Sequence, residues 1–73
     1  MNANTAMQQI LAREGLSPCN ISVAMGYTRS NLTTAFSQKN EPKPSKLAKF
    51  AEATGYELLL RSKSDGFEFL IDE

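Results

Sequence analysis

Several residue types are missing or scarce in this 73-residue chain, and each scarcity narrows its chemistry. The sequence has no histidine, no tryptophan and a single cysteine, Cys19. One cysteine cannot form an internal disulfide, and a mixed Cys/His zinc site needs histidine. We therefore expect no metal and no other cofactor. A core of this size usually needs a further support, and dimerisation is the one that remains.

Long apolar runs and catalytic motifs are also lacking. The N-terminal 16 residues hold no apolar run longer than Ile10–Ala12, so the sequence predicts neither a signal peptide nor a membrane anchor. We therefore expect a cytoplasmic protein. There is no histidine for general-base chemistry and no Gly-rich phosphate loop. The chain is therefore not expected to be an enzyme, and no catalytic residue is proposed.

The formal net charge is zero, but the charges are unevenly distributed. Residues 27–49 carry five basic side chains and one acidic one, a net charge of +4. Residues 52–73 carry two basic and six acidic side chains, a net charge of −4. The middle of the chain therefore has the charge expected of a nucleic-acid contact, and its C-terminal part does not.

The stretch from Ser17 to Gln38 has the spacing of two short helices joined by a tight turn. Ser17 followed by Pro18 is a strong helix start, and Gly26 suits a left-handed position at the helix end. A second helix is expected from Thr28 to about Gln38. The inward side chains of the two helices are expected to be Ile21, Ala24, Met25, Leu32 and Ala35 or Phe36, with the small Ser22 where the helices cross.

Two further helices flank this pair. The first is expected from Thr5 to Glu14, with Asn4 as cap and Gly15 closing it. Two prolines in Lys39–Pro44 indicate a loop, after which Pro44 opens a helix to Thr54 that ends at Gly55. Apolar residues at helical spacing give the inner faces of these helices: Met7, Ile10 and Leu11 in the first, and Leu47, Phe50 and Ala51 in the last.

After Gly55 the pattern becomes alternating and predicts a β-hairpin over about residues 56–73. Strands are expected over 56–63 and 67–72, with Asp65-Gly66 as a two-residue turn that places Lys63 opposite Glu68. Both faces carry apolar groups, and an isolated hairpin is barely stable in water. We therefore expect the hairpin to pack on the helices and on a second copy, through Leu58, Leu59, Leu60, Phe67, Phe69, Leu70 and Ile71.

The helical part resembles the phage lambda repressor/Cro-like helix-turn-helix family, often called the xenobiotic-response-element type. The resemblance covers roughly residues 5–57 and rests on the positions of Gly26, Leu32, Pro42, Leu47, Ala51 and Gly55. It implies one mostly α domain over residues 1–73, a four-helix Cro/repressor-like unit followed by the hairpin. It also implies that the third helix enters the DNA major groove, with Arg29, Ser30, Asn31 and Thr34 facing bases.

The chemistry of these side chains suits that role. Arg29 can pair bidentately with guanine, and Asn31 with adenine. Hydroxyl and ammonium groups around them are candidates for phosphate contacts: Thr28, Thr33, Ser37, Lys39, Lys43 and Lys46.

These features together predict a sequence-specific double-stranded DNA-binding transcriptional regulator. The expected form is a homodimeric repressor of phage, mobile-element or autoregulated-operon type, bound to a pseudo-palindromic site. The alternative is an antitoxin that neutralises a partner toxin through protein contacts and autoregulates its operon, with the acidic hairpin as the docking surface.

Overall fold

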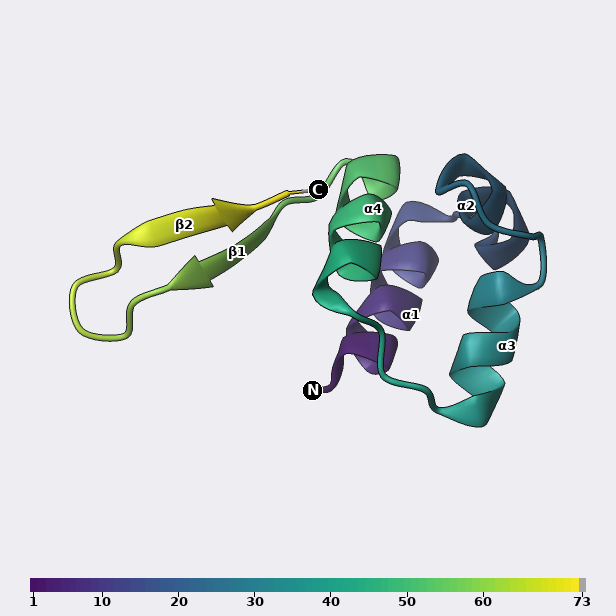
Figure 1. Ribbon diagram of the computed structural model, residues 1–73, viewed down its shortest axis with the longest axis horizontal. Helices are drawn as coiled ribbons and strands as arrows, with labels where there is room; N and C mark the ends of the chain where they lie inside the picture. The colour runs from purple at the N-terminus through teal and green to yellow at the C-terminus, as the bar shows by residue number, and fades with distance from the viewer. Residues whose placement is uncertain (73) are drawn as a thin grey trace.

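The computed structural model describes residues 1–72 and is mostly helical (Figure 1). Four helices are followed by a small antiparallel sheet of two strands, which confirms the predicted class and element order. The Cα atoms extend over 39 × 22 × 20 Å. The elements are α1 (Ala3–Glu14), α2 (Pro18–Ala24), α3 (Asn31–Gln38), α4 (Pro44–Thr54), β1 (Leu58–Arg61) and β2 (Glu68–Ile71).

Helix α1 begins earlier than predicted. Its cap is Asn2, whose side chain accepts a hydrogen bond of 2.8 Å from the Thr5 N–H, so the prediction of Asn4 as cap was wrong. The amide of Asn4 is instead used in a tertiary contact, since its Nδ2 donates to the backbone oxygen of Asn40 at 2.6 Å. The predicted end of the helix at Gly15 is confirmed, with φ at 66°.

Helix α2 and its terminal turn follow the predicted pattern. The Ser17 side chain accepts from the Asn20 N–H, and Pro18 opens the helix. Gly26 has φ at 88°, where a side chain would be strained. Its N–H and that of Tyr27 donate to carbonyls of the last turn, which closes the helix as a Schellman motif. Ala24 was predicted to point inward, but it is exposed.

Helix α3 begins at Asn31, three residues later than the predicted start at Thr28. Thr28 to Ser30 form a turn in which the Asn31 N–H donates to the Thr28 oxygen at 3.1 Å. Ser30 is the N-cap residue, but its side chain makes no capping hydrogen bond. The Leu32 N–H is accepted instead by the hydroxyl of Ser22, at 3.1 Å, so a contact between helices fixes where α3 starts.

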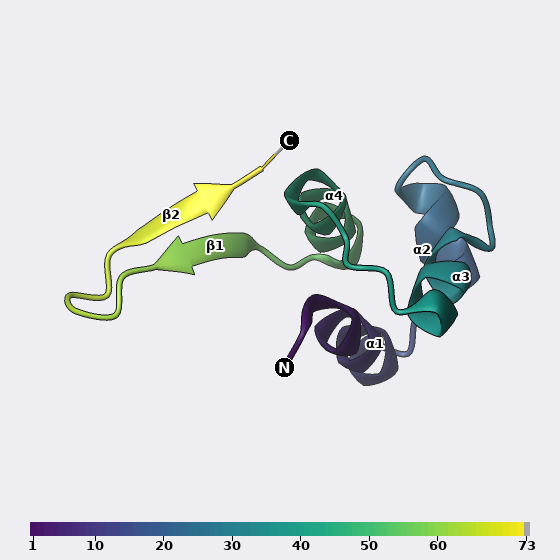
Figure 2. The same cartoon turned by 60° about the horizontal axis from the view of Figure 1, so that its bottom comes forward.

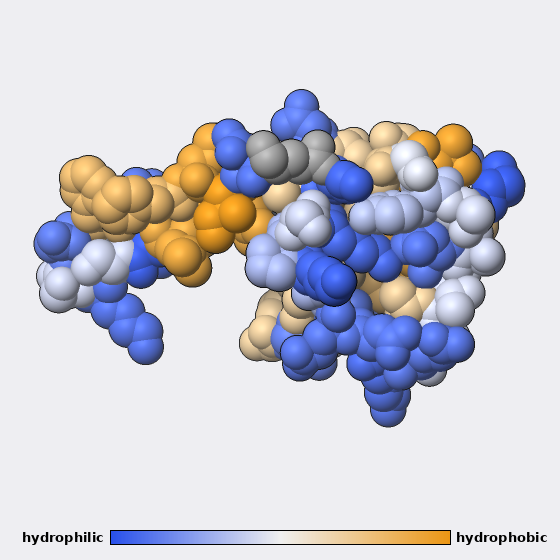
Figure 3. All heavy atoms as spheres, viewed as in Figure 1, coloured by the Kyte–Doolittle hydropathy of each residue, from blue (hydrophilic) through white to orange (hydrophobic). Residues whose placement is uncertain are grey.

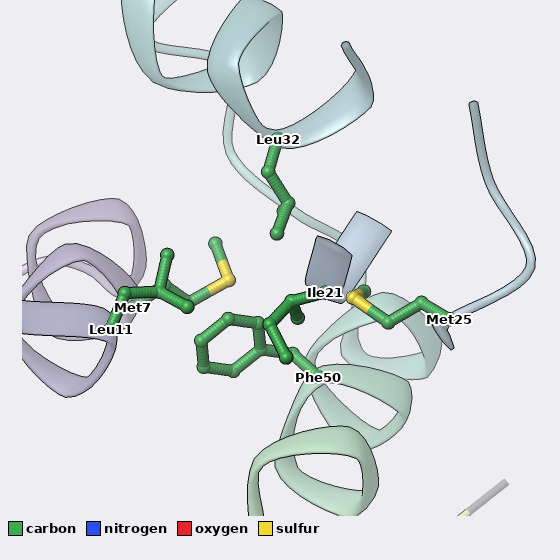
Figure 4. Close-up of a cluster of buried hydrophobic side chains, with 6 residues drawn as sticks. All are labelled: Met7, Leu11, Ile21, Met25, Leu32 and Phe50. Carbon is green, nitrogen blue, oxygen red and sulfur yellow. The ribbon is translucent and has the colours of Figure 1, made fainter. Parts of the chain in front are cut away.

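The core lies among all four helices. Helix α1 packs against α4, and α2 contacts both α3 and α4, as Figures 1 and 2 show. Figure 4 shows the central side chains pointing toward one another. They are Met7 and Leu11 from α1, Ile21 and Met25 from α2 and its end, Leu32 from α3 and Phe50 from α4. The predicted inner residues Ala35 and Ala51 are also buried.

The hairpin register differs from the predicted one by two residues. Leu60 pairs with Phe69 and Arg61 with Glu68, so the expected Lys63–Glu68 pair and the two-residue Asp65-Gly66 turn were wrong. The loop is four residues long, Lys63 to Gly66, because the Ser62 N–H donates to the Phe67 oxygen at 2.8 Å. Side-chain bonds favour this wider loop: Asp65 accepts from the Phe67 N–H, and the Ser62 hydroxyl accepts from the Ser64 N–H.

A slip of two residues leaves each side chain on its predicted face, since the period of a strand is two. One face carries Leu58, Leu60, Phe67, Phe69 and Ile71, and the other carries Leu59, Arg61, Glu68 and Leu70. Within residues 1–72 the hairpin meets the helices at its base, next to α4, and its loop end projects away from them (Figure 1). The expectation that the hairpin packs along the helices was therefore wrong for most of its length.

Candidate nucleic-acid interface

The predicted base-reading residues lie together at the start of α3. Arg29 and Ser30 are exposed in the turn that precedes the helix, and Asn31 is its first residue. Thr34 lies one turn further on, on the same stripe as Asn31. The late start of α3 therefore moves Arg29 and Ser30 out of the helix, onto a turn at its tip.

Asn31 has an unusual environment. Its Oδ1 is buried and has no hydrogen-bond partner. A buried acceptor without a donor typically costs about 1–3 kcal/mol. A rotation of the side chain toward an outside donor would remove that cost, and the amide would then offer both its acceptor and its donor to a ligand.

The hydroxyl groups of α3 are partly engaged within the helix. Thr33 donates to the Ser30 oxygen at 3.0 Å, and Ser37 donates to the Thr34 oxygen at 3.1 Å. Both side chains are exposed on the outer side of the helix. In this arrangement their oxygens can accept hydrogen bonds, and donation to a phosphate requires the hydroxyl to rotate.

An open groove of about 460 Å³ separates the start of α3 from the start of α4. Ser30, Asn31 and Thr34 line it on the α3 side, and Lys43 and Lys46 line it on the other. Thr28 also contributes to its wall. The structure thus brings together residues predicted to read bases and residues predicted to bind phosphate. Four of the predicted residues lie outside the groove lining: Arg29, Thr33, Ser37 and Lys39.

Tyr27 holds two of the cationic side chains of this region. The Nζ of Lys46 is 5.5 Å from the centre of the Tyr27 ring, and that of Lys49 is 5.1 Å from it. Cation–π contacts of this kind are worth about 0.5–1 kcal/mol at exposed sites. Tyr27 and Lys49 were missed by the sequence analysis. An aromatic residue at the mouth of the turn, in a segment rich in lysine, was the available signal.

The loop between α3 and α4 is fixed at both ends. Lys39 ends α3 in a left-handed conformation with φ at 57°, and Lys43 caps α4 without a side-chain hydrogen bond. In between, the backbone of Asn40 accepts the 2.6 Å bond from Asn4 of α1. The backbone that carries the lysines of the loop is therefore held to α1 by this hydrogen bond.

The positive charge of residues 27–49 is gathered on α3, α4 and their connecting loop. The ion pairs Arg13–Glu14, at 3.7 Å, and Arg61–Glu68, at 4.0 Å, lie in α1 and in the hairpin. The acidic segment, which the structure describes over residues 52–72, runs from the end of α4 into the hairpin, and the hairpin projects from the other side of α4 (Figure 1). The two-sided charge pattern of the sequence is therefore also two-sided in space.

Residues 1–72 contain no group of three or more His, Cys, Asp or Glu side chains placed to hold a metal ion. None of their helices is long and apolar enough to cross a bilayer. Comparison of the chain with protein-family models, with curated proteins and with solved structures gives no match.

Proposed function

We propose that the protein is a sequence-specific double-stranded DNA-binding transcriptional regulator that acts as a homodimer. The observation that carries the proposal is the groove between α3 and α4, where Asn31 and Thr34 face Lys43 and Lys46. Polar groups that can read base edges thus lie beside ammonium groups that can pair with phosphate, which is the division of labour found in DNA interfaces.

The side chains at the tip of α3 supply the base reading. Arg29 presents its guanidinium fork to guanine, and Asn31 turns its amide outward to pair with adenine. Turning outward also relieves the buried, unpartnered Oδ1 of Asn31. Ser30 and Thr34 contribute shorter hydrogen-bonding groups, and the whole tip enters the major groove as in other helix-turn-helix proteins.

The surrounding side chains hold the DNA backbone. Lys39, Lys43 and Lys46 supply charge, and their binding to phosphate releases condensed counterions. The hydroxyl groups of Thr28, Thr33 and Ser37 add hydrogen bonds once they rotate outward. The biological role that fits a homodimer of this size is a repressor of phage, mobile-element or autoregulated-operon type, bound to a pseudo-palindromic site.

Selection of bound duplexes from a random DNA pool tests this proposal. We expect enrichment of one sequence with two inverted half-sites about 34 Å apart, or one turn of B-DNA. The pool should be selected in parallel with a variant that carries Arg29→Ala and Asn31→Ala. Failure of the intact protein to enrich any sequence would refute base-specific reading.

A second candidate function rests on the hairpin. Leu60, Phe67, Phe69 and Leu70 are 56–66% exposed, which is much apolar surface for so small a chain. An antitoxin would use this surface to bind and neutralise a toxin, and would use DNA binding to regulate its own operon. A co-transcribed toxin-like reading frame next to the gene favours this alternative, and a divergent promoter or phage genes favour the repressor.

A further inference from the structure

The start of the hairpin and helices α1 and α4 meet at an apolar corner, which is the site of a small cleft. The chain from Tyr56 to Leu58 leaves the helices between α1 and α4 (Figure 2). At this point an apolar cleft of about 230 Å³ opens between the two helices. Ala6 and Ile10 of α1, Leu47 of α4 and Leu58 of β1 line it.

The cleft and the hairpin form one apolar surface. Leu58 lines the cleft and also begins the hairpin face that continues with Leu60, Phe67 and Phe69. Figure 3 shows hydrophobic residues gathered along the hairpin and at the corner where it leaves the helices. The rings of Phe67 and Phe69 lie 5.1 Å apart at the outer part of this face, and both are more than 60% exposed.

The hairpin cannot cover the cleft of its own chain. Its loop end, which carries Phe67, points away from the helices (Figure 1). Typical small-molecule sites have volumes of about 300–1,000 Å³. The cleft is smaller, so its size suits a few side chains better than a free ligand. The exposed phenylalanines and the open cleft are therefore two apolar surfaces that the chain does not cover by itself.

We propose that this partner is a second copy of the chain, with the hairpin of each copy lying in the corner of the other. A two-fold axis makes the exchange reciprocal, so that one kind of contact covers both phenylalanine pairs and both clefts. Phe67 and Phe69 of one copy then fill the cleft lined by Ala6 and Ile10 of its partner. This inference rests on the proposed homodimer and specifies how the two copies are joined.

Helix α1 offers a test that leaves the hairpin untouched. Ala6→Arg places a long charged side chain in the cleft, and Ala12→Arg makes the same change at an exposed position of the same helix outside it. Light scattering at tens of micromolar should give about twice the 8.0 kDa chain mass for the intact protein and for Ala12→Arg. Ala6→Arg should give the mass of a single chain. A monomeric intact protein, or a dimeric Ala6→Arg variant, overturns the proposal.

Ala6 is half-buried, so a second variant guards against misfolding. Ala3→Glu also enters the cleft lining, and an acidic residue suits the first turn of a helix. Circular dichroism should show native helix content in any variant that is scored. If Ala6→Arg does not fold, a dimeric Ala3→Glu variant overturns the proposal in its place.

Cross-linking separates the corner arrangement from simple pairing of two hairpins. Ser62 lies on the phenylalanine face of the hairpin, and Ala3 lies at the cleft. In a Cys19→Ser background, chains with Ala3→Cys and chains with Ser62→Cys are mixed and treated with an oxidant. We expect disulfides between unlike chains. Disulfides confined to pairs of Ser62→Cys chains would overturn the proposal in favour of hairpin pairing.

DNA binding distinguishes failure of this inference from failure of the proposed function. A monomeric Ala6→Arg variant should keep the base preference at a half-site but lose at least about tenfold affinity for the full site. A monomeric intact protein that still reads bases would remove the dimer and leave the DNA function, with the hairpin then free for a toxin. A dimer of the expected kind that binds no specific DNA would leave the dimer arrangement in place and remove the proposed DNA function.

Discussion

The Ser22 hydroxyl accepts the backbone N–H of Leu32 at 3.1 Å, across the turn between α2 and α3. The same hydroxyl donates to the Pro18 oxygen at 2.8 Å, and the side chain is completely buried. One small residue thus links the first turn of α2 to the first turn of α3. The position of Asn31, and with it the tip of the candidate interface, depends on this pair.

Ser22→Ala should therefore lower the free energy of unfolding by about 1–3 kcal/mol, because the buried Leu32 N–H loses its acceptor. The matched control is Ser37→Ala, which removes an exposed hydroxyl and should stay within about 0.5 kcal/mol of the original protein. Urea denaturation followed by circular dichroism measures both. Equal stability of the two variants would show that the Ser22–Leu32 bond does not hold the helices.

Lys39 occupies a left-handed position that glycine fills at the ends of the other three helices or their terminal turns. Lys39→Gly should relieve strain and raise the free energy of unfolding by about 0.5–1 kcal/mol. Lys63→Gly is the control, since Lys63 is exposed in the hairpin loop and does not have a left-handed φ. A thermal melt that ranks Lys63→Gly above Lys39→Gly would contradict the assignment.

Tyr56 donates a hydrogen bond of 2.9 Å to the Glu14 carboxylate, and this bond raises the pKa of Tyr56 above its usual value of 10.0. A raised folded-state pKa means that the contribution is complete below the unfolded pKa and is lost as the pH rises through the folded one. The stability difference between the protein and Tyr56→Phe should therefore shrink above pH 10. In a Glu14→Gln background the pH dependence of this difference should weaken, and its persistence would point to another partner.

The three candidate phosphate lysines, Lys39, Lys43 and Lys46, should act on the DNA backbone. Each change to alanine should weaken binding to specific and random duplexes alike. The slope of log affinity against log salt should fall by about one per lysine per subunit. An unchanged slope in the triple variant would remove these lysines from the interface.

Much of the helical fold is readable from the sequence because its signals are local. Ser17-Pro18, Gly26, Pro44 and Gly55 each set a helix end through their own backbone preferences. Periodic apolar residues such as Leu32 and Phe50 then give the core. The start of α3 was wrong by three residues because a distant acceptor, the Ser22 hydroxyl, fixes it.

The other errors have the same origin. Asn2 and Asn4 are both good caps, and the choice between them depends on the bond from Asn4 to Asn40, far along the chain. In the hairpin, Asp65-Gly66 favours a tight turn, but bonds from Ser62 and Asp65 to the loop backbone favour the wider one. The charged pair at the loop survives with Arg61 in place of Lys63, because both are basic and two residues apart.

The sequence predicts most residues of the candidate interface, but it does not predict the groove that they form. The sequence places Asn31, Thr34 and Lys43 in one motif, and the structure gathers them around a groove. The contacts of Tyr27 with Lys46 and Lys49 join residues 19 and 22 positions apart, and an aromatic residue in a lysine-rich segment does not by itself show which lysines it contacts. These contacts form because α4 lies next to the turn that carries Tyr27.

Base reading by the tip of α3 should appear as a difference between the affinities for the selected duplex and for a scrambled duplex, measured at one salt concentration. Arg29→Ala and Asn31→Ala should each cost roughly 1–3 kcal/mol on the selected duplex and little on the scrambled one. Lys43→Ala, the control, should weaken both equally. Equal losses on the two duplexes for Arg29→Ala and Asn31→Ala would show that the tip of α3 does not read bases.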